Sequence, residues 1–489
     1  MTAQQETEVV GVPDWSYQMQ GFFGDSERST GTRTPRSDGN RFGRQKAVGE
    51  APLAMLEKTV GVMAGGDHIP HVVAWNLTRR CNLECAHCYI SAGPSESAED
   101  ELSTVECQRI IEEILSLNAS PMFILSGGEP LLRQDLDAIA YYATRRGATV
   151  VVGTNGTLLS DERIVRLQDA GVTGVAVSVD SLVDRHHDNF RHGAGARAAT
   201  VEALDRLRTR RLDFIIQTTA HRGNRDEIAE MVDWAAEQGA VSFNLYFLVA
   251  TGRGARLTDL TPDEYESLLS ELVDHQRRHR GRMLVRAKCA PHFMRHVHQR
   301  DPDSPILNYS TRCPCGVQYC RITPDGKLTP CPYLPAHAGD LRQQSFADIW
   351  RDSPLLRDLR TKALGGKCGQ CEYRALCGGC RARAFALEGD VMAADPSCVY
   401  EPDGLTALVA SARTVTYGMT APMSMTWSSD ARARIDRIPS FVRGVVVQRM
   451  EDYARERHLT EITLDLLSEV RRSMPIDFSR RLPFFASND

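Results

Sequence analysis

The sequence predicts an α/β fold made of βα units around a parallel sheet, followed by a cysteine-rich region and a small helical C-terminal part. Between about residues 71 and 287, short apolar runs alternate with longer amphipathic segments, which is the pattern of βα units. Nine of the 14 cysteines then follow between residues 313 and 398. A chain of 489 residues is long enough for two or three domains with a large buried core.

Seven apolar runs are expected to form strands, with six amphipathic helices between them. The predicted strands are 72–77, 122–126, 149–153, 174–179, 213–219, 241–247 and 283–286. The predicted helices are 103–118, 132–146, 160–170, 197–210, 224–238 and 262–279. Because the chemistry of parallel βα folds collects at the carboxyl ends of the strands, we expect the functional residues directly after these runs.

The composition divides the chain into four parts. Residues 1–66 are rich in Ser, Thr, Gly, Arg and Pro, which predicts a mostly disordered tail, although 52–64 has helical spacing. The βα units fill 67–287, and the cysteine-rich domain fills 288–403. In 404–489 we expect a linker and a small helical domain around Pro439, because apolar residues recur there at helical intervals. These residues are Ile435, Ile438, Phe441, Val442, Val445, Met450, Ile462, Leu464, Leu466, Leu467 and Val470.

The charge and the N-terminal sequence exclude several classes of protein. Lys+Arg 58 against Asp+Glu 63 leave a net charge of -5, which is no basic footprint for nucleic acid. The start lacks a basic segment followed by an apolar core, and no run of about eighteen apolar residues occurs, so we expect a cytoplasmic protein without membrane contact. Clustered cysteines in a reducing compartment indicate metal ligands rather than disulfides.

Three cysteines follow the first predicted strand at CxxxCxxC spacing: Cys81, Cys85 and Cys88. Three thiolates are one short of the four that hold an iron–sulfur cluster, so one iron would stay open for a small molecule. The spacing alone leaves two alternatives open, a zinc site with His87 as fourth ligand and three buried free cysteines. The segments further along the chain decide between them.

Polar sets follow the next three predicted strands. They are Ser126-Gly127-Gly128-Glu129-Pro130, Thr154-Asn155-Gly156-Thr157 and Ser178-Val179-Asp180-Ser181. Glycines allow the backbone to approach a ligand closely, although each set alone also suits an ordinary turn or helix cap. Their order after a CxxxCxxC motif resembles the radical SAM (S-adenosylmethionine) enzymes.

The resemblance implies a partial (β/α)6 TIM-like barrel whose first [4Fe–4S] cluster is held by Cys81, Cys85 and Cys88. In that family the open iron chelates the amino and carboxylate groups of SAM, and reductive cleavage yields a 5′-deoxyadenosyl radical. His87 takes the place of the aromatic residue that lies against adenine. The other implied SAM contacts are Gly127, Gly128 and Glu129 for the amino group, and Asn155, Ser178 and Asp180 for the ribose and carboxylate.

The cysteines after the barrel resemble the SPASM extension, which carries auxiliary [4Fe–4S] clusters. The resemblance implies two ligand sets: Cys313, Cys320, Cys331 and Cys380 for one cluster, and Cys368, Cys371, Cys377 and Cys398 for the other. Cys315 is then left without a role, and Cys107 is expected to be a buried small apolar residue. A zinc ribbon over 368–380 is the alternative, because paired CxxC motifs suit tetrahedral zinc.

Several segments point to the substrate class. Segments 248–255, 288–292, 316–326 and 377–383 resemble the radical SAM enzymes that complete haem by the siroheme-dependent route, together with their haem d1 pathway relatives. Residues 438–463 resemble the small C-terminal domain of the light-independent protochlorophyllide reductase B subunit, which handles a tetrapyrrole. A domain for dimer contacts is the alternative for this region.

A ring with several propionates needs cations around a wide mouth. The connection between the barrel and the SPASM extension offers Arg253, Arg256, Arg286, Lys288, His292, Arg295, His296 and His298. Of these we expect Arg253, Arg286 and Arg295 to contact the substrate.

The predicted function is oxidative decarboxylation of porphyrin propionates to vinyl groups in haem or haem d1 biosynthesis. A hydrogen would leave the propionate carbon next to the ring, CO2 would follow, and one electron would pass to an auxiliary cluster. A ferredoxin or flavodoxin-type reductant is the expected partner. Two alternatives remain: maturation of a ribosomally made peptide, and electron transfer by an iron–sulfur protein without catalysis, in which SAM-binding motifs would have no role.

Overall fold

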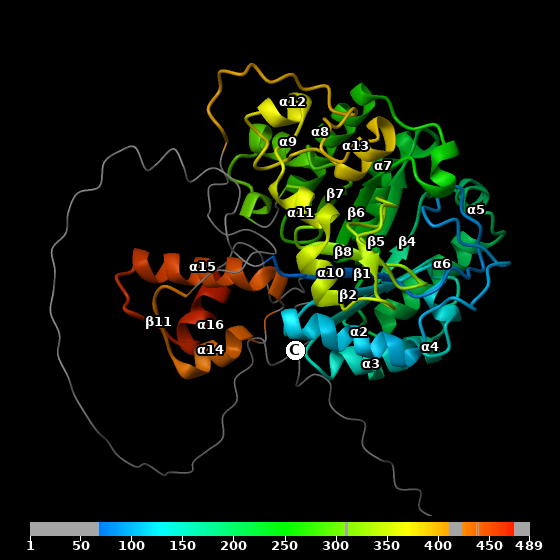
Figure 1. Ribbon diagram of the computed structural model, residues 1–489, viewed down its shortest axis with the longest axis horizontal. Coiled ribbons are helices and arrows are strands. Elements are labelled where there is room, and N and C mark those ends of the chain that lie inside the picture. The colour runs from blue at the N-terminus through cyan, green and yellow to red at the C-terminus, as the bar shows by residue number, and fades with distance from the viewer. Residues whose placement is uncertain (1–67, 309–311, 410–422, 437, 439, 474–489) are drawn as a thin grey trace, which may run out of the picture.

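The structure is a computed structural model that describes residues 68–308, 312–409, 423–436, 438 and 440–473 (Figure 1). The disordered tail expected over 1–66, with the helical spacing at 52–64, lies outside the described residues.

Ten strands form one sheet in the described part of the chain, in the order β10-β9-β8-β1-β2-β3-β4-β5-β6-β7. The seven strands of the barrel run parallel: β1 (Val72–Asn76), β2 (Met122–Ser126), β3 (Thr149–Thr154), β4 (Gly174–Ser178), β5 (Phe214–Ala220), β6 (Ser242–Phe247) and β7 (Leu284–Lys288). Each of the seven predicted strands is present with its ends within two residues, which confirms the parallel α/β fold. Their apolar runs are buried because helices cover the outer side of the sheet.

The helices of the barrel follow the strands as the amphipathic segments predict. They are α2 (Thr104–Leu117), η2 (Pro130–Leu132), α3 (Leu136–Thr144), α4 (Asp161–Asp169), α5 (Asp184–Arg191), α6 (Ala196–Thr209), η3 (Arg222–Glu227), α7 (Ile228–Glu237), η4 (Gly252–Arg256) and α8 (Pro262–Arg278). α2 begins at a capping box, in which Glu106 N donates to Ser103 Oγ at 3.3 Å and Ser103 N donates to the Glu106 carboxylate at 2.7 Å. All six predicted helices are present, and α5 was not predicted.

The cysteine-rich region extends the sheet at its open edge. β8 (Tyr319–Ile322) pairs in parallel with β1, and β9 (Lys327–Thr329) and β10 (Gly339–Asp340) continue antiparallel. The helical elements of this region are α9 (Phe293–Arg300), η5 (Pro305–Asn308), α10 (Phe346–Asp352), α11 (Pro354–Thr361), α12 (Gly366–Gln370) and α13 (Arg381–Glu388). The pairing of β8 with β1 brings the second cysteine region beside the strand that leads into the first.

The C-terminal part has its own hydrophobic core. It consists of β11 (Thr426–Trp427), α14 (Ser429–Asp436), α15 (Ser440–Glu456), β12 (Glu461–Ile462) and α16 (Leu464–Ser473). Of the residues named from the sequence, Ile435, Ile438, Met450, Ile462, Leu466, Leu467 and Val470 lie in this core, whereas Leu464 is exposed. Pro439 and the side chains of Phe441, Val442 and Val445 lie outside the described residues.

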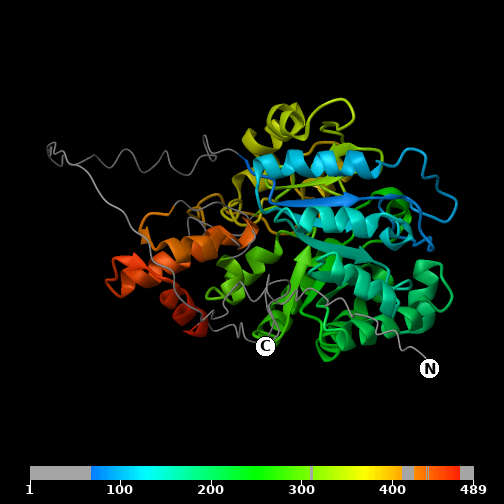
Figure 2. The ribbon, with the colours of Figure 1, turned by 90° about the horizontal axis from the view of Figure 1, so that it is seen from below.

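This C-terminal part lies beside the barrel, at the amino ends of β1 and β2 (Figures 1 and 2). Ser440, the first residue of α15, is the centre of the contact: its Oγ lies 2.9 Å from His71 Nδ1 and accepts from Asn118 Nδ2 at 2.7 Å. Its backbone N donates to Ser120 O at 3.1 Å, and Arg443 Nη2 donates to Ser120 Oγ at 2.6 Å. The docking is therefore polar and lies at the opposite end of the strands from the cysteine loop.

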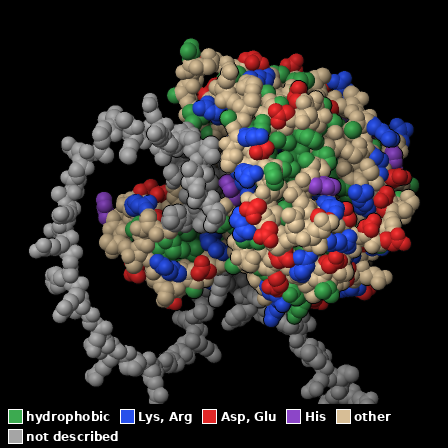
Figure 3. Space-filling view, in the orientation of Figure 1, with side chains coloured by type: hydrophobic (Ala, Val, Ile, Leu, Met, Phe, Trp, Pro, Cys, Tyr) green, Lys and Arg blue, Asp and Glu red, His purple; other side chains and the backbone are tan. Residues whose placement is uncertain are grey.

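The surface carries both signs of charge. Lys and Arg side chains are interspersed with Asp and Glu over the face seen in Figure 3. Among the described residues, no helix combines the length and the apolar character needed to cross a bilayer.

Candidate functional site

Cys81, Cys85 and Cys88 lie on the loop that follows β1. Two backbone amides point at sulfur: Leu83 N lies 3.4 Å from Cys81 Sγ, and Ala92 N lies 3.3 Å from Cys88 Sγ. Burial raises the pKa of the Cys81 thiol to about 12 and also raises the pKa of Cys85. A positive centre is needed to keep these sulfurs as thiolates, and a bound iron cluster supplies one.

The turn after β6 supports the cysteine loop. Arg253 Nε donates to Cys85 O at 2.9 Å, and its Nη2 donates to Ala92 O at 2.7 Å. Gly252 has a φ of 54°, and a Cβ there would lie 2.5 Å from Cys88 O. The Arg253 guanidinium therefore supports the loop through its carbonyls. Arg253 also lines the large cavity beside the loop, so its expected contact with a substrate stays a prediction.

The Gly127-Gly128-Glu129 turn after β2 lies against the other side of the loop. Gly128 N donates to Thr78 O at 2.7 Å, and Glu129 N donates to Arg80 O at 2.9 Å. A Cβ on Gly127 would lie 2.6 Å from Thr78 O, and one on Gly128 would lie 2.3 Å from Arg80 O. The close approach that demands these glycines is thus an approach to the protein's own backbone, although both also line the cavity described below.

Glu129 is fully buried and connects the ends of β2 and β3. Its carboxylate accepts hydrogen bonds from Leu131 N at 3.1 Å, Thr154 Oγ1 at 2.8 Å and Asn155 N at 2.9 Å. Burial raises the pKa of this carboxyl, and the hydrogen bonds oppose that shift. Glu129 therefore fixes Asn155, whose amide faces the cavity and lies 4.0 Å from Cys81 Sγ.

The carboxylate of Asp180, just after β4, forms an ion pair with Arg191 of α5. Arg191 donates to Asp180 Oδ2 from Nε at 2.9 Å and from Nη2 at 2.6 Å, and Thr219 N donates to Oδ1 at 2.8 Å. Although burial opposes ionisation, the Arg191 guanidinium holds the pKa of the Asp180 carboxyl well below its usual range. Arg191 Nη1 lies 3.9 Å from Cys85 Sγ, and Arg191 and Ser178 line the cavity where Asp180 does not. Arg191, missed in the sequence, is thus the residue that faces the cysteines.

His87 is stacked on Phe190, with ring centroids 4.7 Å apart and 1° between the planes. His221 covers the other face of Phe190 at 4.2 Å. Burial lowers the pKa of His87 to about 4, so the ring is neutral at physiological pH. Its Nδ1 is buried and makes no hydrogen bond within the described part of the chain, so it remains available to a ligand in the cavity.

A cavity of about 510 Å³ joins the cysteine loop to the second cysteine region. Its wall runs from His71 at the amino end of β1 to Arg286 and Lys288 on β7. Burial lowers the pKa of Lys288 to about 8, with Arg286 as the second cause. Four tyrosines that the sequence analysis did not single out complete the wall: Tyr89, Tyr246, Tyr319 and Tyr333.

Five cysteines line the same cavity away from the loop: Cys289, Cys313, Cys315, Cys331 and Cys380. The thiol of Cys315 contacts those of Cys313 and Cys331, which raises the pKa of Cys315 well above its usual range. Cys289 likewise contacts Cys380. Cys315 therefore belongs to this group, and so does Cys289, to which no role was assigned from the sequence.

Cys320 does not belong to this group, and its prediction as a ligand is wrong. It lies on β8 opposite Val73 of β1, is fully buried, and packs in the core of the barrel. Burial raises its pKa, and the charge of Arg360 opposes this shift. Side chains alternate along a strand, so Tyr319 faces the cavity and Cys320 faces away. Cys107, also fully buried, packs in the same core, as its helix position suggests.

The remaining cysteines gather at a second, smaller pocket. Cys368, Cys371, Cys377 and Cys398 line it together with His292 and Arg295. Backbone amides again point at sulfur, since Asp395 N lies 3.4 Å from Cys368 Sγ and Gly379 N lies 3.4 Å from Cys377 Sγ. Arg295 is not on the wall of the large cavity, because its guanidinium pairs with Glu266 at 2.5 Å. Its expected contact with the substrate is therefore corrected.

A parallel βα barrel with a three-cysteine loop at the carboxyl end of β1, and two further cysteine groups behind it, defines a radical SAM protein with a SPASM extension. The sequence matches the Radical SAM superfamily over residues 75–235 and an iron-sulfur cluster-binding domain of the SPASM type over 313–380. Residues 427–471 match the proto-chlorophyllide reductase 57 kD subunit. [4Fe–4S] clusters and SAM are the cofactors of such domains.

Two curated relatives come from Methanosarcina barkeri. The AdoMet-dependent heme synthase is 40% identical over 343 residues, which cover 68% of this chain and 97% of the relative. The Fe-coproporphyrin III synthase is 30% identical over 399 residues, covering 77% and 97%. The chain belongs to the radical SAM family that includes the AdoMet-dependent heme synthases.

The solved structure of Streptococcus suis SuiB bound to S-adenosylmethionine is similar in fold. It superposes with a TM-score of 0.56 at 15% identity, covering 68% of this chain and 78% of SuiB. At this identity the similarity concerns the architecture alone.

Proposed function

We propose that this protein is a radical SAM enzyme that acts on a tetrapyrrole by oxidative decarboxylation of propionate side chains. The observation that carries the proposal is one cavity of about 510 Å³. Its wall contains the three cysteines of the loop, the five cysteines of the second group, and the cations Arg286 and Lys288. The volume is in the range of small-molecule sites. The relationship to the AdoMet-dependent heme synthase supports a tetrapyrrole as the ligand.

The residues of the loop suit the cofactors of the family. Cys81, Cys85 and Cys88 would hold the first cluster, and Gly127, Gly128, Asn155, Ser178 and Arg191 would face SAM beside it. Bound there, the two groups supply a carbon radical able to remove a hydrogen atom. The five cavity cysteines and the four cysteines of the smaller pocket would hold one auxiliary cluster each.

The reaction balances with these parts. Removal of one hydrogen atom from the propionate carbon next to the ring leaves a radical at that carbon. Cleavage of the bond to the carboxylate then releases CO2, forms the vinyl group and frees one electron, for which an auxiliary cluster held by the second cysteine group would be the acceptor. Arg286 and Lys288 would hold a propionate by charge-assisted hydrogen bonds, while the tyrosines form a wall for the ring and exclude water.

The test is turnover by anaerobically reconstituted protein with SAM, dithionite and iron-coproporphyrin. The expected product has lost the mass of CO2 and two hydrogens for each propionate converted, with formation of 5′-deoxyadenosine. SAM cleavage that a porphyrin does not stimulate, but a cysteine-containing precursor peptide does, would overturn the proposal in favour of peptide maturation.

The cations of β7 give a second test. The Arg286→Met variant should weaken porphyrin binding by about one to two powers of ten, the worth of one charge-assisted hydrogen bond, and leave SAM binding unchanged. Arg282→Met is the matched control. Arg282 precedes the same strand, is exposed, and donates to Ala236 O at 3.1 Å, and it does not line the cavity. Equal porphyrin affinity in the two variants would show that Arg286 does not bind the substrate.

A further inference from the structure

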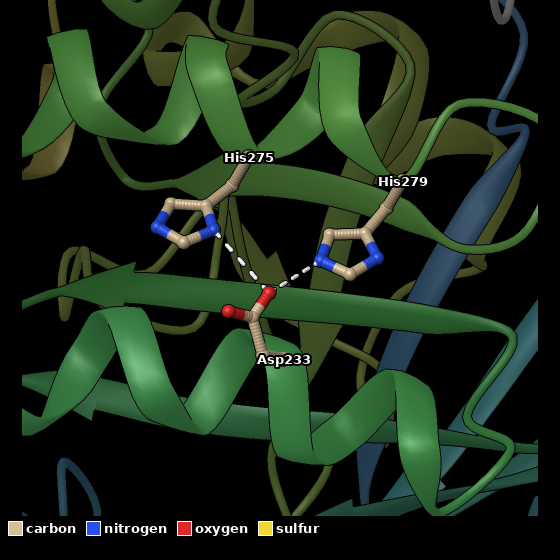
Figure 4. Close-up of side chains that lie close together, drawn as sticks. All are labelled: Asp233, His275 and His279. Carbon is tan, nitrogen blue, oxygen red and sulfur yellow. Dashed lines mark hydrogen bonds and ion pairs between the residues drawn. The ribbon is translucent and has the colours of Figure 1, made fainter.

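Two helices on the outside of the barrel bring two histidines and a carboxylate together. His275 lies in the last turn of α8 and His279 caps that helix, so their i, i+4 spacing puts both rings on one face. Asp233 reaches toward them from α7, as Figure 4 shows. The rings are nearly parallel, with 4° between their planes and 6.4 Å between centroids. None of the three residues lines the large cavity.

The distances suit a small divalent cation. His279 Nε2 lies 2.7 Å from Asp233 Oδ1, and His275 Nδ1 lies 3.8 Å from the same oxygen. All three candidate ligand atoms lie within 4.8 Å of one another. Tetrahedral zinc with bonds of about 2.0 to 2.2 Å separates its ligand atoms by about 3.3 Å, between the two observed distances. A small rotation of the half-exposed Asp233 side chain would therefore open the position of the ion.

An unsatisfied atom points to a ligand at this place. His275 is only 6% exposed, and its Nδ1 is buried and makes no hydrogen bond to any described residue. A buried polar atom without a hydrogen bond costs free energy, and such atoms are rare. The Asp233 carboxylate lies 3.8 Å from this atom, a distance too long for a hydrogen bond. A metal ion between the two would satisfy the atom.

Arg278 competes for the same carboxylate but does not close the site. Its Nη1 lies 3.1 Å from Asp233 Oδ2 and 3.4 Å from Oδ1, and its side chain is 58% exposed. An exposed ion pair of this kind is worth about 0 to 1 kcal/mol. Arg278 can therefore remain on Oδ2 while Oδ1 turns to the ion.

We propose that Asp233, His275 and His279 bind one Zn²⁺ ion that joins α7 to α8, with water as the fourth ligand. Two imidazoles and one carboxylate form a nitrogen and oxygen ligand set that zinc favours. The partly exposed carboxylate leaves the fourth position open to solvent. The site is separate from the cysteine groups and does not depend on the proposed reaction.

The test uses holoprotein with all clusters in place, so that free cysteines do not capture zinc. Zinc is titrated against a fluorescent chelator while the iron content is followed. We expect one zinc per chain, bound tighter than about 10 μM, with the iron content unchanged. His275→Asn should weaken binding at least tenfold, whereas His337→Asn, which removes an exposed histidine elsewhere, should leave it unchanged. Arg278→Gln should tighten binding by up to about fivefold, because a competing cation is removed.

Hydrogen exchange gives a readout that zinc at a cysteine site would not produce. Zinc should slow amide exchange in α7 and in the last turns of α8 in the wild-type protein but not in His275→Asn. The proposal is overturned if holoprotein takes up no zinc at this affinity, or if His275→Asn binds zinc as tightly as His337→Asn.

Discussion

Tyr319 and Cys320 are neighbours on β8 but face opposite sides of the sheet, and this determines which cysteines meet. Spacing along the chain counts residues and does not record the side of a strand, so the sequence assigned Cys320 as a ligand and left Cys315 out. A strand of four residues is too short for its period of two to stand out. The first three cysteines were predictable because they share one continuous loop, and the polar sets after the next strands supported the same interpretation.

The corrected assignment predicts different iron contents for two variants. Cys320→Ala should keep about twelve irons, four for each of three clusters, and lose about 1 kcal/mol of stability as a small core truncation. The Cys289→Ala/Cys315→Ala variant leaves three thiols of the cavity group, with no ligand such as SAM for the fourth iron, and should lose about four irons. Iron analysis after anaerobic reconstitution measures both. Loss of iron from Cys320→Ala, with full iron in the double variant, would restore the assignment from spacing.

At the scale of elements, the barrel strands were predictable because their apolar runs are buried, whereas α5 was not. Its sequence, Asp184–Arg191, is almost entirely polar, and only His187 and Arg191 are buried, so no apolar period marks it as a helix. Yet α5 supplies Arg191 to the cavity and Phe190 to the ring stack. Apolar periodicity therefore misses a helix of this kind, because its buried face carries the polar side chains of a site instead of the apolar side chains of a core.

The turn between β6 and η4 is predicted to hold the cysteine loop in shape. Gly252→Ala forces a Cβ against Cys88 O, and SAM cleavage should fall at least tenfold with loss of about four irons. Gly281→Ala is the control, because Gly281 also has a positive φ of 80° but no atom within 4 Å of the added Cβ. It should cost about 1 kcal/mol of stability and leave SAM cleavage intact. Similar cleavage by both variants would show that the contact with Cys88 is unimportant.

For the whole molecule, the sequence predicted the C-terminal helical domain but not where it docks. Its helices follow apolar spacing, and residues 427–471 match the proto-chlorophyllide reductase 57 kD subunit. Neither observation indicates which residues of the barrel it contacts. That contact joins His71 and Asn118 to Ser440 across more than 300 positions of the chain through polar groups. Hydrophobic periodicity carries no information about such pairs. His71 also lines the cavity, so the residue that contacts the C-terminal part is at the same time part of the cavity wall.

The titration of His71 makes this docking depend on pH. Burial, with the Arg443 charge as the second cause, lowers the pKa of His71 to about 4, whereas a His released to solvent titrates near 6.5. The docking energy is therefore fully present above about pH 6.5 and is lost as the pH falls toward 4. Between about pH 8 and about pH 6 the loss is about 1 kcal/mol, roughly fivefold in the docking equilibrium. Hydrogen exchange at the start of α15, corrected for intrinsic rates, should show this change in the wild-type protein and be flat in His71→Gln. An equal pH dependence in the variant would assign the effect to another group.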